Sequence, residues 1–184
     1  MVEVIRRSAL EGIVPIVHGS VAITVAPALA RCIVRGGAAV ADAVGAAFGV
    51  PLPASPCRAA TLGARAALWL GPDEWLLLAP DDDGVWSAVT AALGDLAGAV
   101  VEVGHRQVGL RVQGSGSARV LNGGCPLDLD CAAFPVGMCT RTVFAKTEIV
   151  LWRCEADCFH VEVARSFAGY LHGMLSEIAV DLTG

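Results

Sequence analysis

The sequence consists mainly of short apolar runs separated by turns rich in glycine, proline, aspartate and serine, a pattern that favours a sheet-rich domain with a few helices. The clearest unit spans residues 108–170. It predicts a strand at 108–112, a Gly-Ser-Gly-Ser turn, a short helix at 118–122, three strands near 141–145, 148–153 and 159–163, and a closing helix from about Ser166. The rest of the chain is organised around this unit.

The preceding part of the chain predicts a similar series of elements. An apolar strand at 29–35 ends at two glycines and is followed by an alanine-rich helix at 38–48. Prolines at 51, 53 and 56 mark a loop. The remaining predicted elements are two strands at 66–70 and 75–79 joined by a Gly-Pro-Asp-Glu turn, a helix at 85–93 and a strand at 99–103.

The two series form a diverged internal repeat. Residues 29–103 give the order β-α-β-β-α-β, and the second series resembles it. Each copy is too small to bury both faces of its own sheet, so we expect the two to share a core. The predicted fold class is α+β, with mostly antiparallel sheets and a ferredoxin-like arrangement of two diverged copies. The expected organisation is an N-terminal arm at 1–20, a first copy at 21–104 that includes a strand or strap at Val21–Val25, and a second copy at 105–184, packed as one compact unit.

The composition contains more apolar residues than an ordinary soluble chain. Hydrophobic residues make up 55% of the sequence and the mean hydropathy is +0.62, whereas charged residues make up 17%, below the roughly 25% that is typical. Either the core is unusually compact or part of the apolar surface faces another protein. We favour a sizeable permanent interface.

Charge and segment composition exclude several classes of function. The net charge is −5 and the basic residues form no run, so a nucleic-acid partner is not expected. The longest stretch without charged residues, 12–30, contains Pro15 and Pro27 and therefore predicts no membrane-spanning helix. Residues 1–7 lack the features of a signal peptide. We expect a cytoplasmic chain.

The seven cysteines have no spacing typical of a metal site. Cys125, Cys131 and Cys139 match no common zinc pattern. Cys154, Cys158 and His160 form the most metal-like group, but the sequence around them predicts two strands joined by a Glu-Ala-Asp turn, and no second pair of ligands accompanies them. We therefore interpret the cysteines as structural thiols and expect no metal in this chain.

Three polar segments have both a functional and a structural interpretation. The Gly-Ser-Gly-Ser turn at 114–117 resembles a phosphate-binding loop but lacks the third glycine, so an ordinary strand-to-helix turn is favoured. The three aspartates at 81–83 predict a solvated loop rather than a cation site, with Asp83 able to cap the next helix. Asp128 and Asp130 are expected to hydrogen-bond the backbone of their loop.

His105 and Arg106 form the most informative polar pair. They lie at the junction between the two copies, where they could meet a ligand or a partner. A catalytic histidine needs an orienting group and a reactive neighbour, and no such set is evident in the sequence. We interpret the pair as a partner contact or a structural junction. No catalytic, cofactor-binding or metal-binding residue is predicted.

An ordered set of short segments resembles the gamma subunit family of heterotetrameric sarcosine oxidase. The resemblance spans about Ala26 to Leu175, and Gly104 departs from it because a serine is expected before His-Arg. The segments, in chain order, are Gly71-Pro72-Asp73-Glu74-Trp75-Leu76, His105-Arg106-Gln107, Pro126-Leu127-Asp128-Leu129, Phe134-Pro135-Val136-Gly137, Thr140-Arg141-Thr142, Ile149-Val150-Leu151-Trp152-Arg153 and Arg165-Ser166-Phe167-Ala168.

The resemblance implies an accessory, non-catalytic gamma subunit that stabilises the alpha and beta subunits, with a fold similar to the folate-binding region of the glycine-cleavage T-protein. The family's complex converts sarcosine to glycine, transfers a one-carbon unit to tetrahydrofolate and produces hydrogen peroxide. FAD, FMN and NAD are then expected in the alpha and beta subunits and zinc in the delta subunit. His105, Arg106 and Arg141 are the candidate partner contacts.

Three alternatives remain open from the sequence. The chain could be the small subunit of a related N-methylglutamate dehydrogenase. It could be a free-standing folate-binding domain in which the turn at His105 and Arg106, or Arg141, lies near an anionic ligand. An enzyme that acts alone is the third alternative and the one that the sequence favours least.

Overall fold

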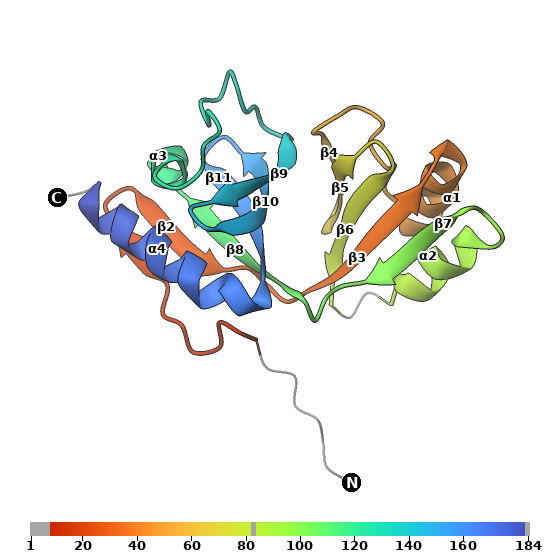
Figure 1. Cartoon of the computed structure of the whole chain (residues 1–184), viewed down its shortest axis with the longest axis horizontal. Coiled ribbons are helices and arrows are strands. Elements are labelled where there is room, and N and C mark those ends of the chain that lie inside the picture. Colours follow the sequence, from red (N-terminus) through yellow and green to blue (C-terminus); the bar gives the residue numbers. More distant parts are fainter. Residues whose placement is uncertain (1–7, 82–83, 183–184) are drawn as a thin grey trace, which may run out of the picture.

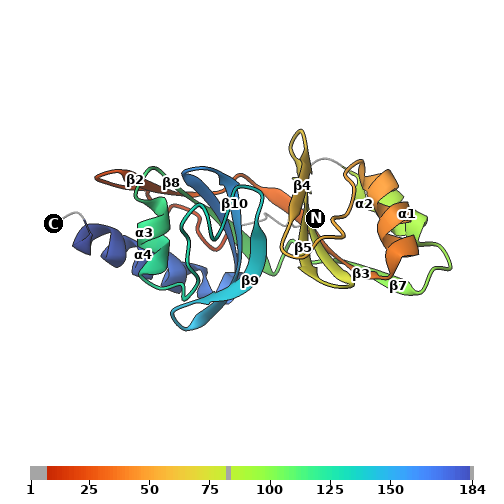
Figure 2. The same cartoon turned by 90° about the horizontal axis from the view of Figure 1, so that it is seen from above.

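Strands with buried apolar side chains build two separate antiparallel sheets in the computed structural model, which describes residues 8–81 and 84–182. The helices cover the outer faces of the sheets, and the inner faces turn toward each other (Figure 1). Seen from above, the two sheet-and-helix halves lie side by side along the longest axis of the molecule (Figure 2). The α+β class with mostly antiparallel sheets is confirmed.

The first sheet has the ferredoxin-like connectivity that the sequence predicts. Its strand order is β4-β5-β6-β3-β7, in which every neighbouring pair is antiparallel. The connection from β3 to β5 runs through α1, and the connection from β6 to β7 runs through α2. The bounds are β3 (Leu29–Gly36), α1 (Ala38–Phe48), β4 (Ala59–Leu62), β5 (Arg65–Gly71), β6 (Glu74–Pro80), α2 (Trp86–Leu93) and β7 (Gly98–Glu102).

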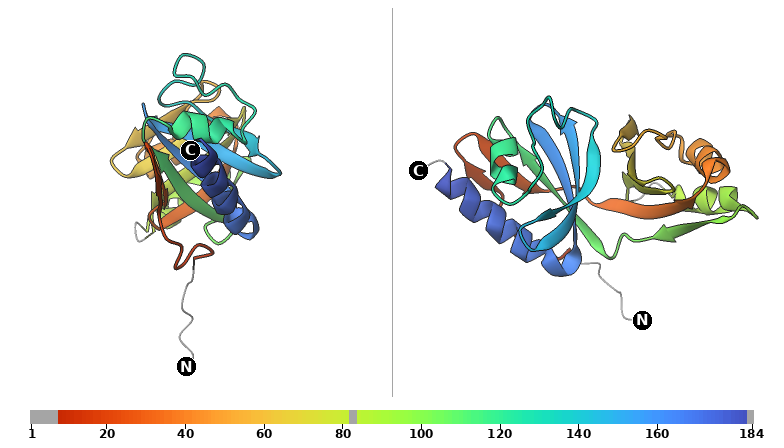
Figure 3. Two further views of the ribbon diagram at one scale, coloured as in Figure 1. Left: turned by 90° about the vertical axis from the view of Figure 1, so that its left-hand side faces the viewer. Right: turned by 45° about the horizontal axis from the view of Figure 1, so that its top comes forward.

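The second sheet has the order β1-β2-β8-β11-β10-β9, again antiparallel throughout. The helix α4 lies along its outer face, with α3 beside it (Figure 3). The bounds are β1 (Ile16–His18), β2 (Val21–Val25), β8 (Gln107–Gln113), α3 (Ser117–Asn122), β9 (Cys139–Phe144), β10 (Thr147–Glu155), β11 (Cys158–Ala164), the 3-10 helix η1 (Arg165–Phe167) and α4 (Ala168–Asp181).

The internal repeat is visible in the strand orders, but the strand β2 belongs to the second sheet rather than to the first. The series β4-β5-β6-β3 of the first sheet corresponds to β9-β10-β11-β8 of the second. In the first sheet β7 pairs with β3, whereas in the second sheet β2 takes the equivalent place beside β8. The sequence division assigned Val21–Val25 to the first copy, and this assignment is corrected. The strand completes the second sheet because the apolar side chains of Val21 and Ile23 are buried in that sheet's core.

The N-terminal segment is more ordered than an extended arm. Residues 1–7 lie outside the described part of the chain. From residue 8 onward, Leu10 is buried in the core of the second half and β1 pairs with β2. The sequence missed β1 because three residues are too few to establish an alternation of apolar and polar positions. The strand β4 was missed for a similar reason, because it has only four residues.

Three apolar clusters hold the fold together. One lies between the second sheet and helices α3 and α4, and another lies between the first sheet and helices α1 and α2. The third contains Leu68 and Leu76 from the first sheet together with Cys139 and Val150 from the second, so it lies between the two sheets. The two halves therefore share a core, as the small size of each copy predicts.

The local predictions for the polar turns are confirmed where the chain is described. The turn at 114–117 joins β8 to α3, with Gly116 at the N-cap. A side chain at Gly114 would come within 1.9 Å of the Ser20 carbonyl oxygen, and its φ is +107°. Asp128 and Asp130 each accept a hydrogen bond from the backbone two residues further on, at 2.9 and 2.8 Å. Asp82 and Asp83 of the acidic loop lie outside the described residues.

Two kinds of feature are absent from the described part of the chain. None of its helices combines the length and the apolar character that crossing a membrane requires. Nowhere in residues 8–81 and 84–182 do three or more His, Cys, Asp or Glu side chains gather closely enough to hold a metal ion.

Candidate functional site

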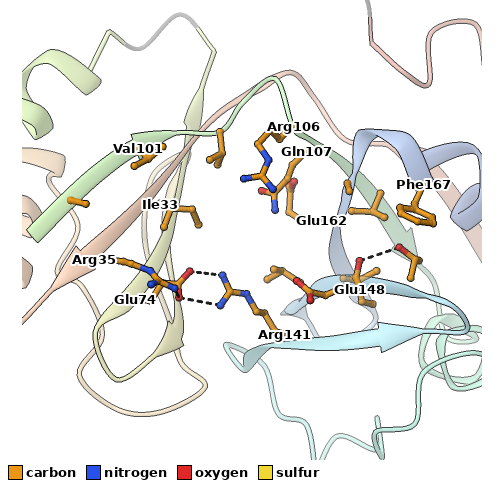
Figure 4. Close-up of a pocket in the computed structure, with 17 residues that line it drawn as sticks. Ile33, Arg35, Glu74, Val101, Arg106, Gln107, Arg141, Glu148, Glu162 and Phe167 are labelled. Carbon is orange, nitrogen blue, oxygen red and sulfur yellow. Dashed lines mark hydrogen bonds and ion pairs between the residues drawn. The ribbon is translucent and has the colours of Figure 1, made fainter.

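A cleft of about 520 Å³ opens between the two sheets and borders their shared core, with Val103 and Val150 belonging to both (Figure 4). Ile33 and Val101 contribute to its apolar surface from the first sheet, and Val163 and Phe167 contribute from the second half. Val101 and Phe167 remain 52% and 46% exposed. The two sheets thus leave an apolar surface that neither half covers.

An ion cluster joins the two sheets at one end of this cleft. Glu74 of β6 is buried, and its carboxylate accepts hydrogen bonds from both terminal nitrogens of Arg141 on β9 and, at 2.7 Å, from Arg35 on β3. The hydrogen bond from Arg141, followed by that from Arg35 and the two positive charges, holds the pKa of Glu74 below its usual range, although burial alone would raise it. Glu74 therefore remains ionised near neutral pH.

A second ion cluster joins the sheets near the point where the chain crosses between them, and it is fully buried. Arg31 of β3 donates to both carboxylate oxygens of Glu162 on β11, at 2.7 and 3.0 Å, and His160 shares a hydrogen bond of 2.6 Å with the same carboxylate. Arg31 also donates to the Leu29 carbonyl at 2.7 Å. A side chain at Gly109 would lie about 3 Å from both His160 and Glu162, so a glycine leaves space for this network.

The pKa of Glu162 reflects two opposing effects. Burial would raise it, but the hydrogen bond and charge of His160 and the ion pair with Arg31 outweigh burial and lower it. Glu162 is therefore ionised, and its charge is fully matched inside the protein. The side chain lies at the floor of the cleft without a free charge to offer to a ligand.

Arg106 is the cation of the cleft that remains without an ion pair among the described residues. It lies between β7 and β8, and its side chain points toward Gln107 and the cavity (Figure 4). The side-chain oxygen of Gln107 is buried and has no hydrogen-bond partner within residues 8–81 and 84–182. Together, the guanidinium of Arg106 and the amide of Gln107 offer both donors and an acceptor to a molecule that enters.

The cleft is lined by two buried carboxylates that are held in ion pairs and by a third, Glu148, that is exposed. Glu74 and Glu162 are both committed to ion pairs, and the hydroxyl of Thr147 is hydrogen-bonded to the Glu148 carbonyl. A general acid or base requires a group that can exchange a proton near the working pH, and the lowered pKa values of both carboxyls oppose this. Apolar walls with one unpaired arginine are typical of a surface that receives another molecule.

The structure separates the three predicted partner-contact residues. Arg106 and Arg141 line the same cleft, although they are 35 residues apart in sequence. His105 instead lines a groove of about 450 Å³ on the other side of the junction, next to Pro27 and Val108. Arg141 is also not a free cation, because Glu74 neutralises it.

Sequence reasoning missed Arg31, Glu74 and Glu162 as members of the site. A charged residue inside an apolar strand signals that it needs a buried partner, and both Leu29–Gly36 and Cys158–Ala164 contain such a residue, Arg31 and Glu162. The identity of the partner could not be deduced, because Arg31 and Glu162 are 131 residues apart in sequence.

The Arg141–Glu74 pair leads to a prediction about stability. Replacing Arg141 with glutamine is expected to lower the free energy of unfolding by about 0.5–1 kcal/mol near neutral pH, because Arg141 is partly exposed and water screens the pair. The pKa of Glu74 is lowered in the folded state, so this contribution is present above the ordinary carboxyl pKa of about 4.3. It is lost as the pH falls through the lower folded value.

Urea unfolding at several pH values measures this effect. Arg106→Gln is the matched control, since this cleft arginine has no ion pair among the described residues and should change stability little. An equal loss in both variants, or a loss in Arg141→Gln that does not shrink in acid, would contradict the role of the pair.

Comparisons with known proteins were consistent with each other. Residues 35–181 match the model of the "Sarcosine oxidase, gamma subunit family". The sarcosine oxidase subunit gamma of Corynebacterium sp. (strain P-1) is 35% identical over 132 residues, and that of an Arthrobacter species is 36% identical over 126 residues. These matches cover 72% and 68% of this chain but only 64% and 61% of the relatives' length.

Solved structures extend the comparison to the fold. A chain of the heterotetrameric sarcosine oxidase from Corynebacterium sp. U-96, in complex with pyrrole 2-carboxylate, superimposes with a TM-score of 0.89 at 26% identity, covering 97% of each chain. The glycine cleavage system aminomethyltransferase T from Bartonella henselae matches with a TM-score of 0.65 at 14% identity, covering 86% of this chain and 46% of that one. At that identity the second match concerns the fold alone, and it confirms the predicted T-protein-like fold.

Proposed function

This chain belongs to the sarcosine oxidase gamma subunit family, and from that premise we propose that it is an accessory, non-catalytic subunit of a heterotetrameric sarcosine oxidase. In this role it would stabilise the larger alpha and beta subunits. The complex would oxidise sarcosine to glycine, pass the one-carbon unit to tetrahydrofolate and produce hydrogen peroxide in the cytoplasm.

The observation that carries the proposal is the match over nearly the whole chain with one chain of a heterotetrameric sarcosine oxidase. The cleft supports the same proposal, since its two buried carboxylates, Glu74 and Glu162, are held in ion pairs and much of its wall is apolar.

FAD, FMN and NAD are expected in the alpha and beta subunits, and zinc in the delta subunit. Within residues 8–81 and 84–182 no residue set fits these groups: three or more potential metal ligands do not gather anywhere there. The glycine turn at 114–117 is the nearest candidate for a phosphate cradle, but the space beside Gly114 is filled by the Ser20 carbonyl rather than open to a ligand. The helix that follows, α3, has only six residues, so the positive end of its dipole would contribute little to phosphate binding.

The cleft between the two sheets is the proposed contact with a large subunit. Its half-exposed Val101 and Phe167 would be buried by a partner, and the unpaired Arg106 would meet a carboxylate or carbonyl group of that partner. Arg141 would contribute mainly by keeping the two sheets at the correct spacing. His105 would contact a partner only if that partner also reaches the opposite groove.

Reversing the charge of Arg106 is expected to weaken assembly. With Arg106→Glu, the amount of partner subunit that is recovered with the tagged chain should fall about tenfold, because arginines in partly buried contacts commonly carry a large share of binding energy. The measurement is quantitative co-purification from cells that express all four subunits.

The matched control is Arg119→Glu on α3, an exposed arginine of the outer surface far from the cleft. Recovery of the partner should be unchanged in this variant. If Arg119→Glu reduces recovery as much as Arg106→Glu, or if His105→Ala alone abolishes recovery, then the cleft is not the main contact.

Two alternatives have distinct tests. A small subunit of an N-methylglutamate dehydrogenase would also assemble, but the purified complex would oxidise N-methylglutamate in preference to sarcosine. A free-standing folate-binding domain would bind tetrahydrofolate without any partner. Calorimetric titration of the isolated chain with tetrahydrofolate is expected to give no heat of binding, and a clear binding isotherm would favour this alternative.

A further inference from the structure

Two cysteines face each other at the end of the β10–β11 hairpin. The pairing of the strands shifts by one residue at Cys154, which is the extra residue between Arg153, opposite Phe159, and Glu155, opposite Cys158. The thiols of Cys154 and Cys158 lie within hydrogen-bond reach of each other, and the Cys154 thiol also donates to the Trp152 carbonyl oxygen at 3.8 Å. Paired residues of an antiparallel ladder have Cα atoms about 4.5–5.5 Å apart, and Cys154 is the immediate neighbour of the residue paired with Cys158, so the two cysteines lie close to the separation that a disulfide spans.

The surroundings favour the thiolate form of one member of the pair. The hydrogen bond from Cys154 lowers the pKa of Cys158 to about 7, against the effect of burial, and the positive charge of Arg111 on the neighbouring strand β8 acts in the same direction. Glu155 opposes it more weakly. The same hydrogen bond raises the pKa of Cys154, which therefore holds the shared proton.

Hydrogen-bond donors without partners lie close to the pair. Nε of Arg111 and Nε1 of Trp152 are buried and have no acceptor among residues 8–81 and 84–182. Trp152 lies two positions from Cys154 on the same face of β10, and Arg111 pairs with His160, two positions from Cys158. Such donors can stabilise negative charge on a sulfur atom or on an oxygen bound to it.

A small oxidant can reach the pair. Cys158 lines an open groove of about 700 Å³ that lies between the hairpin turn and the segment from Gly19 to Ala22. Cys158 is 5% exposed and Cys154 is partly exposed. Hydrogen peroxide is small enough to approach the Cys158 sulfur from this groove, whereas a bulky reagent would be hindered.

A second pair of neighbouring cysteines provides a contrast. The backbone of Cys139 is hydrogen-bonded to that of Cys57 at 3.0 Å. However, burial raises the pKa of Cys139 to about 12, so this thiol stays protonated and unreactive. The Cys154–Cys158 pair is thus distinguished by its hydrogen bond and its charged surroundings rather than by proximity alone.

We propose that Cys154 and Cys158 form a peroxide-reactive thiol pair that closes to an intrachain disulfide. The Cys158 thiolate attacks one oxygen of hydrogen peroxide, the O–O bond breaks, and the hydroxide released takes a proton to become water, leaving a sulfenic acid on Cys158. The sulfur of Cys154 then attacks the Cys158 sulfur, the S–O bond breaks and a second water leaves. Two thiols are oxidised by two electrons, and one peroxide is reduced to two waters.

The reaction needs a peroxide from any source, so the proposal does not depend on the complex in which the chain acts. That the complex itself supplies the peroxide rests on the proposed function. Disulfides in reducing compartments are usually transient and redox-sensing. A thiol pair at the end of a hairpin would be oxidised to the disulfide when peroxide is made nearby.

Mass spectrometry of the full chain tests the pair directly. The purified chain is treated with hydrogen peroxide, alkylated, and digested with trypsin, which cuts after Arg153 and Arg165 and releases both cysteines in one peptide. This peptide is expected to become resistant to alkylation and lighter by two hydrogens, and dithiothreitol should reverse the change. In Cys154→Ser, dimedone should capture a sulfenic acid on Cys158.

Cys131→Ser is the matched control because Cys131 is exposed and belongs to no thiol pair in the described chain. Its loss should leave the rate of disulfide formation unchanged, whereas Cys158→Ser should abolish the modified peptide. The proposal is overturned if the peptide from 154 to 165 remains fully alkylated while other cysteines oxidise, or if Cys154→Ser gives no dimedone adduct on Cys158. Because added peroxide is used on the isolated chain, failure here is separate from failure of subunit assembly.

Discussion

Replacing Glu162 with alanine is expected to lower the free energy of unfolding by about 3–5 kcal/mol, because it breaks a buried ion pair. The substitution leaves the buried guanidinium of Arg31 without its carboxylate partner, and removes the hydrogen bond to His160. Arg31 retains only the hydrogen bond to the Leu29 carbonyl. Urea unfolding followed by circular dichroism measures the loss.

Glu148→Ala is the matched control because Glu148 is an exposed carboxylate on the neighbouring strand β10. It should change the free energy of unfolding by no more than about 0.5 kcal/mol. Similar losses in the two variants would show that the buried network is not a special source of stability.

The same network predicts how stability depends on pH. The pKa of Glu162 is lowered in the folded state, so its contribution is complete above the ordinary carboxyl pKa of about 4.3. It is lost as the pH falls through the folded value. The difference in stability between the wild-type chain and Glu162→Gln should therefore shrink in acid, and a difference that grows as the pH falls would contradict the assignment.

Truncating Leu68 to alanine is expected to cost about 2–5 kcal/mol, because its side chain is fully buried in the apolar cluster between the two sheets. We infer that the two halves fold as one unit, so the substitution should lower the stability of both halves. Hydrogen exchange should speed up in β8 and β11 of the second sheet as well as in β5 and β6. Urea unfolding should remain a single transition at a lower midpoint.

Leu62→Ala provides the comparison within the same half, since Leu62 on β4 is 67% exposed. Its expected effect is within about 0.5 kcal/mol. Faster exchange limited to the first sheet in Leu68→Ala, or two separate unfolding transitions, would mean that each half is stable without the other.

The elements with strong local signals could be predicted from the sequence. The helix Ala38–Phe48 and the strands around residues 75–79 and 159–163 have long apolar patterns bounded by glycine or proline, and they form where expected. What could not be predicted was pairing over long distances. The strand Val21–Val25 was recognised, but its partner β8 begins 82 residues after it ends, at Gln107, and no local pattern distinguishes that strand from the nearer β3.

The candidate site was predictable only in part, for the same physical reason. Arg106 and Arg141 were selected from the sequence, and the fold places both in one cleft. His105 instead lines the other groove, because residues 104–106 form a turn closed by the hydrogen bond from Arg106 N–H to the Val103 carbonyl, and the two neighbouring side chains leave it in different directions. The carboxylates that neutralise the arginines come from strands far along the chain, so whether an arginine is free or paired could be learned only from the structure.

Co-purification is the most direct test of the proposal that this chain is an accessory subunit. The tagged chain is expressed together with the products of its neighbouring genes, purified by affinity, and examined by mass spectrometry and visible absorption. The account predicts a yellow complex that contains larger flavin-binding chains and oxidises sarcosine, while the isolated chain has no turnover. A colourless chain that purifies alone as a stable monomer would contradict it.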